Sequence, residues 1–327
     1  MSRLPTVAIV IPVRNGAARL PACLQSIREL DYPADRVEVL IADGRSTDGT
    51  RTVAEAFGAR VVDNPHELVA SGRNAGFAAA RAEVVAFTDD DCTFDREWLR
   101  NAVTHLQEPG LAGVGGPTLV PPDESAFGKA VAYFFRLGVR FADSVHAEEV
   151  PTPRDVTDLP GCNMVYRHEA LQKVMPCPET LITCEDVELG CRLRDRGYRL
   201  RSAPDVRVFH HKRPTPGRFY RQIARFAMGR MQLSRRRAEV LRPTHIVAGM
   251  AIPMALLLSP VVAPATPLVL LAIFVLALID TRSAGVAARA AFVVPGAVAA
   301  WSWGFLREWL FPTSTDDMEF DWSRYAG

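Results

Sequence analysis

Three consecutive carboxylates, Asp89, Asp90 and Asp91, follow an apolar run at residues 84–87. The β-branched and aromatic residues of this run predict a buried strand. Because side chains alternate along a strand, we expect Asp89 and Asp91 to project the same way from its carboxyl end, where open α/β sheets bind ligands. Two carboxylates in a cleft are costly unless a cation neutralises them, and Mg²⁺ or Mn²⁺ commonly bridges such groups to a diphosphate. The triplet predicts a metal-dependent enzyme acting on a nucleoside diphosphate compound.

Two further motifs are placed to contact such a compound. Asp43 ends a second apolar run, where its carboxylate can accept a hydrogen bond from a nucleobase N–H or a ribose hydroxyl. Thr47 and Asp48 are better explained as caps of the following helix. Arg73 lies in the segment 71–76, which we expect to open a helix. From a helix N-terminus its guanidinium can reach a phosphate, although a surface arginine in a tight turn would fit the same pattern.

A candidate base and two candidate ligands come later in the chain. We predict that Asp186, at the start of a helix, takes a proton from an attacking hydroxyl, although acids there also complement the helix dipole. Gly161 and Asn163 are predicted to line the acceptor side of the cleft. Either His210 or His211, which follow another apolar run, could complete the cation's coordination. We assign His211 to the metal, while a strand-end histidine is more often only a polar contact.

The elements that must position these residues alternate between strand and helix up to about residue 105. Continuous apolar strands of this kind are typical of a parallel sheet covered on both faces, which makes the fold class α/β with a mostly parallel sheet. The middle of the chain, residues 106–215, is less regular and rich in Pro and Gly. The predicted strands are 7–11, 37–42, 59–62, 84–87 and 206–209, and the predicted helices are 20–27, 50–57, 75–81 and 185–196.

Bulk composition bounds the class of protein. With 327 residues the chain can form one large α/β domain and an appendage. Its six cysteines form no C-x-x-C pair, so we interpret them as reduced thiols of a cytosolic domain. Pro12 and Arg14 interrupt the first apolar run, so a secretory signal is not expected. The same turn lacks G-x-G-x-x-G, which argues against a nicotinamide enzyme.

The last third of the chain is strongly apolar. Residues 246–279 contain no charged side chain, and residues 285–306 contain only Arg289. A membrane-spanning helix needs about 20 apolar residues, and prolines lie near the centre of the first stretch. We therefore predict a hairpin of two short membrane helices with a third after it, giving two or three transmembrane helices within residues 244–311. A buried helical subdomain is the alternative.

A basic segment, residues 212–243, precedes these helices. Between Lys212 and Arg242 there are ten Lys or Arg residues and one acid. Phe219, Ile223 and Phe226 recur on one helical face, a pattern that suits an interfacial helix lying on anionic lipid at the cytoplasmic side. We do not predict nucleic-acid binding, because no recognisable module accompanies the basic residues.

Together these motifs resemble the inverting glycosyltransferases of family 2. The likeness spans roughly residues 5–230. The chain also resembles, more loosely, the succinoglycan-type exopolysaccharide glucosyltransferases of bacteria. The matching segments occur in the family's order and are residues 9–15, 42–50, 72–76, 89–91, 161–164 and 185–186.

The resemblance implies a GT-A fold, a Rossmann-like catalytic domain over residues 1–230, with a nucleotide-sugar donor and a divalent cation, Mg²⁺ or Mn²⁺. It implies Asp186 as catalytic base, and Asp89 and Asp91 as metal ligands beside the predicted His211. The resemblance also implies that Glu185 lies on the acceptor side, together with Gly161 and Asn163. The implied donor-binding residues are Pro12, Arg14, Asn15, Asp43, Arg73, Asp89 and Asp90.

Gln222 and Arg225 also resemble part of the family, the Q-x-x-R-W motif of processive synthases, and are assigned to the acceptor side. Phe226 replaces the tryptophan, and there are too few membrane helices for a translocation channel. We therefore favour transfer of a single sugar over processive synthesis.

The predicted function is transfer of one sugar, with UDP-hexose as the expected donor, to a lipid-linked saccharide or glycolipid. The expected site is the cytoplasmic face of the cell inner membrane, in cell-envelope or exopolysaccharide synthesis. A catalytically silent nucleotide- or lipid-binding scaffold and a nucleotidyltransferase are the rival hypotheses. The acidic tail, residues 312–327, is given no role.

Overall fold

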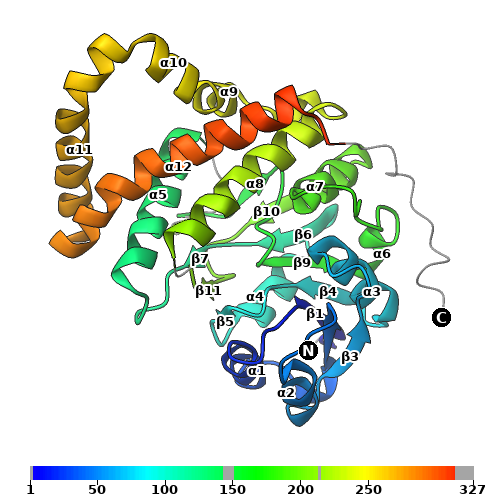
Figure 1. Cartoon of the computed structure of the whole chain (residues 1–327). Helices are drawn as coiled ribbons and strands as arrows, with labels where there is room; N and C mark the ends of the chain where they lie inside the picture. Colours follow the sequence, from blue (N-terminus) through cyan, green and yellow to red (C-terminus); the bar gives the residue numbers. More distant parts are fainter. Residues whose placement is uncertain (1–2, 143–150, 213–214, 314–327) are drawn as a thin grey trace.

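The computed structural model describes residues 3–142, 151–212 and 215–313 (Figure 1). The acidic tail predicted from the sequence lies outside the described residues from position 314 onward.

The centre of the catalytic region is an eight-stranded sheet in the order β3-β2-β1-β4-β9-β6-β10-β8. The four strands from β3 to β4 are mutually parallel, whereas β9 is antiparallel to both of its neighbours. The carboxyl ends of β1, β2 and β4 therefore meet the start of β9 at one edge. The strands are β1 (Val7–Val13), β2 (Val37–Asp43), β3 (Arg60–Asp63), β4 (Val84–Phe87), β6 (Leu111–Gly115), β8 (Arg154–Val156), β9 (Met164–Arg167) and β10 (Arg199–Ser202).

Helices cover both faces of this sheet. Alternate residues of β1 enter two separate cores, since Ile9 packs with α1 and α4 while Val10 packs with α3, α6 and α7. The helix predicted at residues 20–27 is confirmed as α1, and it buries Leu20, Cys23, Leu24 and Ile27 against the sheet. The covering helices are α1 (Leu20–Arg28), α2 (Thr50–Ala56), α3 (Val69–Ala79), α4 (Trp98–His105), α6 (His168–Leu171) and α7 (Glu185–Asp195).

A small second sheet lies beside the carboxyl edge of the first. It contains β5 (Cys92–Phe94), β11 (Val208–His210) and β7 (Thr118–Leu119) in the order β5-β11-β7. Because β5 begins directly after the aspartate triplet and β11 ends at His210, this sheet brings the histidine to the aspartates.

The remaining helices form a layer over one end of the catalytic region (Figure 1). Its core joins α5 (Ala126–Ala142), α8 (Pro216–Ser234) and α12 (Ala284–Leu310). The apolar stripe of the basic segment, including Phe219 and Ile223, is buried in this core. The expectation that this stripe lies on lipid was therefore wrong, because α5 and α12 cover it. The helix α5 was not predicted.

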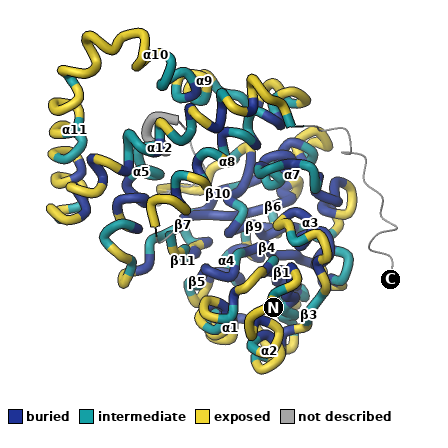
Figure 2. The backbone as a smooth tube through the Cα atoms, in the orientation of Figure 1, coloured by how far each residue is buried: buried dark blue, intermediate teal, exposed yellow. Residues whose placement is uncertain are grey.

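The apolar stretch 246–279 also differs from its predicted hairpin. It forms α9 (Pro243–Gly249), α10 (Ala251–Leu257) and α11 (Ser259–Thr281), and Pro264 and Pro267 lie inside α11. The chain reverses instead at Arg282, whose φ is 51°, before α12. By length and composition α11 and α12 could cross a membrane. Figure 2 shows that α10 and α11 are mostly exposed, whereas α12 is partly covered.

Candidate functional site

The aspartate triplet divides into two groups that face opposite ways, as the alternation of side chains predicted. Ligand atoms of Asp89, Asp91 and His210 all lie within 4.8 Å of one another. His210 Nε2 is 3.1 Å from Asp91 Oδ1. Two carboxylates and an imidazole form a donor set that fits a divalent cation.

The histidine in this group is His210 and not His211, which the sequence analysis assigned to the metal. His211 Nδ1 is 3.5 Å from Glu124 Oε2, and the His211 side chain is nearly half exposed. Neighbouring residues at a strand end project to opposite sides, and the pairing of β11 with β5 decides which one faces the aspartates. That pairing was not evident from the sequence.

The charges at this site are poorly compensated by the protein alone. Burial, followed by the nearby Cys162 thiol, raises the pKa of Asp89, and the opposing influence of Arg73 does not restore it. Burial would lower the pKa of His210, but Asp91 and Cys162 together outweigh it and raise the pKa to about 10. The imidazolium thus offsets part of the negative charge of the two carboxylates and leaves the rest uncompensated.

Asp90 points away from this group and braces the start of the first helix. Its Oδ2 accepts a hydrogen bond of 2.6 Å from Arg19 Nη2, and the Asp90 side chain is 12% exposed. A Cβ at Gly16 would collide with this carboxylate. Asp90 therefore holds the loop after β1 against the triplet, which is a structural role.

Arg73 connects the aspartates with the predicted base. Its side chain is 3% exposed and forms an ion pair with Glu185 at the start of α7. Its Nη2 donates a hydrogen bond of 3.0 Å to the carbonyl of Gly161 and lies 3.9 Å from Asp89 Oδ1. Arg73 lies within α3 and not at its N-terminus, so it reaches the cleft from the middle of a buried helix.

Asp186 lies in the same cluster. A Cβ built on Gly161 would be 2.9 Å from Arg73 Nη2 and 3.2 Å from Asp186 Oδ2, so the absence of a side chain there permits this approach. Burial and then the neighbouring Glu185 carboxylate raise the pKa of Asp186 to about 7, against the lowering effect of Arg73. A carboxylate with such a pKa can take a proton near neutral pH.

The predicted donor-binding residues gather at the ends of β1 and β2. Arg14 pairs with Glu67, and Asn15 Oδ1 accepts a hydrogen bond of 2.8 Å from the Thr47 amide. Pro12 packs near Gly72. The Asp43 carboxylate is fully buried, and Arg51 Nε donates to it over 2.7 Å.

The half-exposed Arg51 therefore occupies the carboxylate that the sequence analysis assigned to the donor. The N-cap of α2 is Gly49 and not Asp48, but the Asp48 carboxylate accepts a hydrogen bond of 3.0 Å from the amide of Thr50, the first residue of the helix.

Asn163, predicted on the acceptor side, does not face the cleft. It is completely buried, its Oδ1 accepts a hydrogen bond from Trp98 Nε1, and its Nδ2 donates to the Val206 carbonyl. A buried amide of this kind must have both of its polar atoms paired. Here the two hydrogen bonds fix the loop before β9 to α4 and to the segment before β11.

The helix α8 approaches the start of α7 from the other side. Arg225 is exposed and its Nη2 is 3.3 Å from the Ile182 carbonyl, while Gln222 is partly buried. The sequence analysis missed Gln232, which is buried and hydrogen-bonded to Ile182 and Thr180. It also missed Arg230: burial would lower the pKa of this residue, but Cys184, Asp158 and Asp186 together raise it. Neither residue lies in a motif that the sequence analysis identified, so no signal pointed to it.

Comparison with known proteins gives a family match. Residues 8–175 match the model of glycosyl transferase family 2. The glycosyltransferase AglE of Haloferax volcanii is 30% identical over 241 residues, which is 71% of this chain and 75% of that protein.

A Methanococcus voltae protein is 24% identical over 66% of this chain and 70% of its own length. That relative is named dolichyl N-acetyl-alpha-D-glucosaminyl phosphate 3-beta-D-2,3-diacetamido-2,3-dideoxy-beta-D-glucuronosyltransferase.

A solved structure shares the fold over most of the chain. It is the mannosyltransferase PcManGT of Pyrobaculum calidifontis, solved with GDP-Man and Mn²⁺. The TM-score is 0.64 at 22% identity, covering 92% of this chain and 88% of the other. This likeness confirms the α/β, GT-A fold expected from the sequence.

We predict that Arg73→Met destabilises the protein without any donor present. Removing one partner from a buried charge cluster costs about 3–5 kcal/mol, so the thermal midpoint should fall. Without the guanidinium the pKa of Asp186 rises further, and a group whose folded pKa is raised loses stability as pH increases through it. The deficit should therefore be larger at pH 8 than at pH 6, as measured by thermal unfolding in detergent.

The matched control is Arg100→Met, which breaks an exposed pair with Asp31 and should change stability by under about 1 kcal/mol. An Arg73 variant as stable as the wild type at both pH values would mean that the fold does not need this guanidinium to offset the charges of Asp89, Glu185 and Asp186.

Proposed function

Because the chain belongs to glycosyltransferase family 2, we propose that it transfers one sugar, with inversion, from a nucleoside diphosphate sugar to a lipid-linked or glycan acceptor. One observation carries this proposal: Arg73 lies between two groups at one edge of the sheet. The first group is Asp89, Asp91 and His210, and the second is Asp186. A cation-binding group and a base with a raised pKa are thus held on opposite sides of one buried arginine.

On the donor side, Asp89, Asp91 and His210 would hold a divalent cation, Mg²⁺ or Mn²⁺, which neutralises charge developing on the leaving diphosphate. Arg73 Nε is buried without a hydrogen-bond partner among the described residues. A phosphate oxygen of the donor would satisfy it, which supports Arg73 near the diphosphate.

Arg14, Asn15 and Asp43 would position the nucleoside at the ends of β1 and β2. We keep UDP-hexose as the proposed donor, with the GDP-mannose of the structural relative as its main competitor.

On the acceptor side, Asp186 removes the proton from the attacking hydroxyl. The resulting nucleophile attacks the anomeric carbon from the face opposite the diphosphate, so the configuration inverts and a single base is sufficient. Gly161 leaves room for the acceptor beside Asp186, and Glu185 keeps Arg73 oriented. Arg225 and Gln222 on α8 would border the path of the acceptor.

The acceptor is proposed to be lipid-linked because a large apolar surface adjoins the catalytic region. Leu268, Leu271 and Ile279 on α11 are each more than half exposed, and α11 packs onto α12. The Methanococcus relative carries a dolichyl phosphate acceptor in its name, which supports the same class of acceptor here. We propose that α10 and α11 enter the cytoplasmic leaflet of the inner membrane, with α8 and α12 against the catalytic domain, and that the product is a cell-envelope or exopolysaccharide glycan.

A donor screen tests the reaction itself. Purified protein in detergent, with Mn²⁺ or Mg²⁺ and a polyprenyl-linked acceptor extract, should release nucleoside diphosphate from one of UDP-, GDP- and dTDP-sugars. EDTA should abolish the release, because the two aspartates lose the cation that stabilises the leaving group. Release that is equally fast in EDTA would overturn the metal-dependent mechanism, and equal activity on free sugars would overturn the lipid-linked acceptor.

Asp186→Asn tests the base. The variant should lose at least about a hundredfold in kcat, because proton removal of this kind contributes 10²–10⁴-fold, while isothermal titration should show unchanged donor affinity. In the wild type kcat/KM should rise with pH through an apparent pKa near 7, since only the deprotonated Asp186 accepts the proton.

The matched control is Asp195→Asn at the other end of α7, where the carboxylate pairs with Arg237 and is half exposed. Its pH profile and turnover should match those of the wild type. If Asp186→Asn turned over normally, another group would have to be the base.

Membrane attachment is tested by flotation with liposomes of neutral and anionic lipid. Leu268→Lys combined with Leu271→Lys should reduce the floated fraction severalfold, because charged groups are costly in the hydrocarbon region. The control pair, Thr104→Lys with Gln107→Lys, adds the same charge at exposed positions of the catalytic domain and should float like the wild type. Undiminished flotation of the α11 variant would exclude this helix as the membrane contact.

A further inference from the structure

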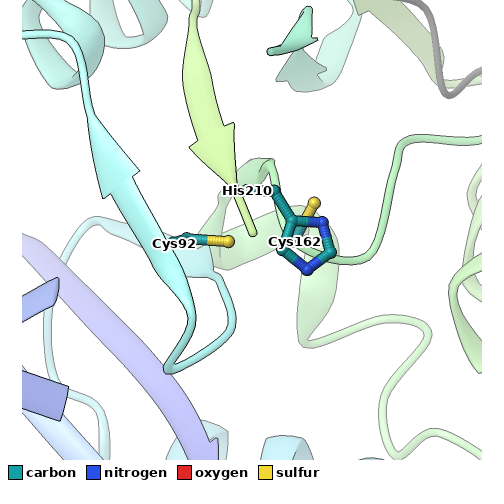
Figure 3. Close-up of side chains that lie close together, drawn as sticks. All are labelled: Cys92, Cys162 and His210. Carbon is teal, nitrogen blue, oxygen red and sulfur yellow. The ribbon is translucent and has the colours of Figure 1, made fainter. Parts of the chain in front are cut away.

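A thiol–imidazole cluster lies directly behind the proposed donor site. Ligand atoms of Cys92, Cys162 and His210 all lie within 4.8 Å of one another (Figure 3). The Cys162 thiol interacts with both the Cys92 thiol and the His210 ring. The three residues come from β5, from the loop before β9 and from the end of β11, so the fold and not the local sequence brings them together.

Regular structure fixes the positions of these residues. Cys92 and His210 are direct partners in the antiparallel pairing of β5 with β11, which places their side chains on the same face. The Cys162 backbone is held by a hydrogen bond of 2.8 Å from Thr88 Oγ1 to its carbonyl. Thr118 Oγ1 lies 3.8 Å from the Cys162 thiol. Rigid elements of this kind are what a metal site requires.

The other four cysteines are placed differently. All six are buried, and a buried cysteine is ordinarily a small apolar side chain. Within the described residues, no other cysteine belongs to a group of three convergent metal-ligating side chains. Cys23 faces a backbone carbonyl and Cys177 faces the Met175 sulfur. Packing alone thus accounts for these cysteines but does not explain why two thiols converge on an imidazole.

We propose that Cys92, Cys162 and His210 bind a thiophilic divalent cation such as Zn²⁺, at a second site that shares His210 with that of the hard cation. Two thiolates and one imidazole are a common donor set for zinc, with a water or a carboxylate in the fourth position. Binding forms two metal–sulfur bonds and one metal–nitrogen bond and releases the two thiol protons and the His210 imidazolium proton to solvent, with no oxidant required.

The spacing fits such an ion after small side-chain rotations. Tetrahedral coordination with Zn–S of about 2.3 Å and Zn–N of about 2.0 Å places ligand atoms roughly 3.4–3.8 Å apart. The upper limit of 4.8 Å in the structure therefore leaves about 1 Å to close. Asp91, which already contacts His210, is the nearest candidate for the fourth ligand.

His210 belongs to both groups, which couples the second site to the first. A neutral imidazole ligates one ion with one nitrogen, so occupation of the thiol site withdraws His210 from Asp89 and Asp91. Cys92 is fully buried and Cys162 nearly so, whereas the Asp89 side chain is 33% exposed, so an ion enters through the donor cleft. Zinc would therefore inhibit Mn²⁺-dependent transfer, a consequence that rests on the proposed function.

The binding test does not depend on activity. Metal-free full-length protein in detergent, with a thiol-free reductant, is titrated with Cd²⁺ while the ultraviolet thiolate-to-cadmium charge-transfer band is followed. The wild type should saturate at one ion per chain, and Zn²⁺ should displace the Cd²⁺. Absence of the band in the wild type would overturn the site.

Variants assign the ligands. Cys92→Ser and Cys162→Ser should each weaken Cd²⁺ binding by roughly tenfold or more and diminish the band, while Cys177→Ser should bind as the wild type does. Asp89→Asn should retain the band, because Asp89 belongs only to the hard-cation site. An unchanged titration in both serine variants, or loss of the band in Asp89→Asn, would refute a separate thiol site. Circular dichroism and thermal unfolding check that each variant is folded.

The activity test follows separately. Added Zn²⁺ should inhibit Mn²⁺-dependent transfer by the wild type at least tenfold, and Cys92→Ser should resist this inhibition while keeping its turnover with Mn²⁺ alone. Equal inhibition of both proteins would contradict the coupling through His210. If no donor were turned over at all, the proposed function would fail while the Cd²⁺ titration would still decide the metal site.

Discussion

The arrangement of the site depends on one buried cation, the guanidinium of Arg73. Glu185, Asp89 and Asp186 come from two separate elements, the end of β4 and the start of α7, and their mutual repulsion would push these elements apart. Arg73 lies between them and also binds the Gly161 carbonyl, so it fixes the loop that separates the cation-binding side from the base. A buried charge is tolerated only when it is paired and hydrogen-bonded, and each group here supplies what the others need. The same contacts that remove the electrostatic penalty therefore set the spacing of the cleft.

Much of this arrangement could be predicted from the sequence because it follows from strand ends. Continuous apolar runs predicted β1, β2 and β4, and the alternation of side chains separated Asp89 and Asp91 from Asp90. In a parallel sheet the carboxyl ends share one edge, so residues far apart in the sequence were expected to meet there. The motif order then suggested the family, which the comparison confirmed. Local periodicity and sheet geometry carried these inferences.

What could not be predicted depends on contacts between distant elements. Asn163 has the residue type of a cleft amide, but pairing with Trp98 and Val206 turns it inward. His210 was not chosen over His211 because only the register of β11 against β5 distinguishes them. The apolar stripe of α8 has the period of a lipid-facing helix, yet α12 covers it: a Cβ at Gly304 would collide with the Ala224 backbone. Periodicity identifies an apolar face but not the surface that covers it.

The base is held from the side of the apolar helices as well as by Arg73. Gln232 on α8 bonds Ile182 and Thr180, and the Thr183 hydroxyl donates to the Arg225 carbonyl, so the segment leading into α7 rests along α8. Close contact at Gly229 leaves no room for a side chain between them. Because α8 packs on α12, and α12 packs on the exposed α11, a series of packed helices connects Asp186 with the surface proposed to meet the membrane. A donor bound at the strand ends is soluble, whereas a lipid-linked acceptor must come from that surface. In the proposed function Asp186 would lie where the two approaches converge, and its carboxylate is held both by Arg73 and by the segment that rests on the helical layer.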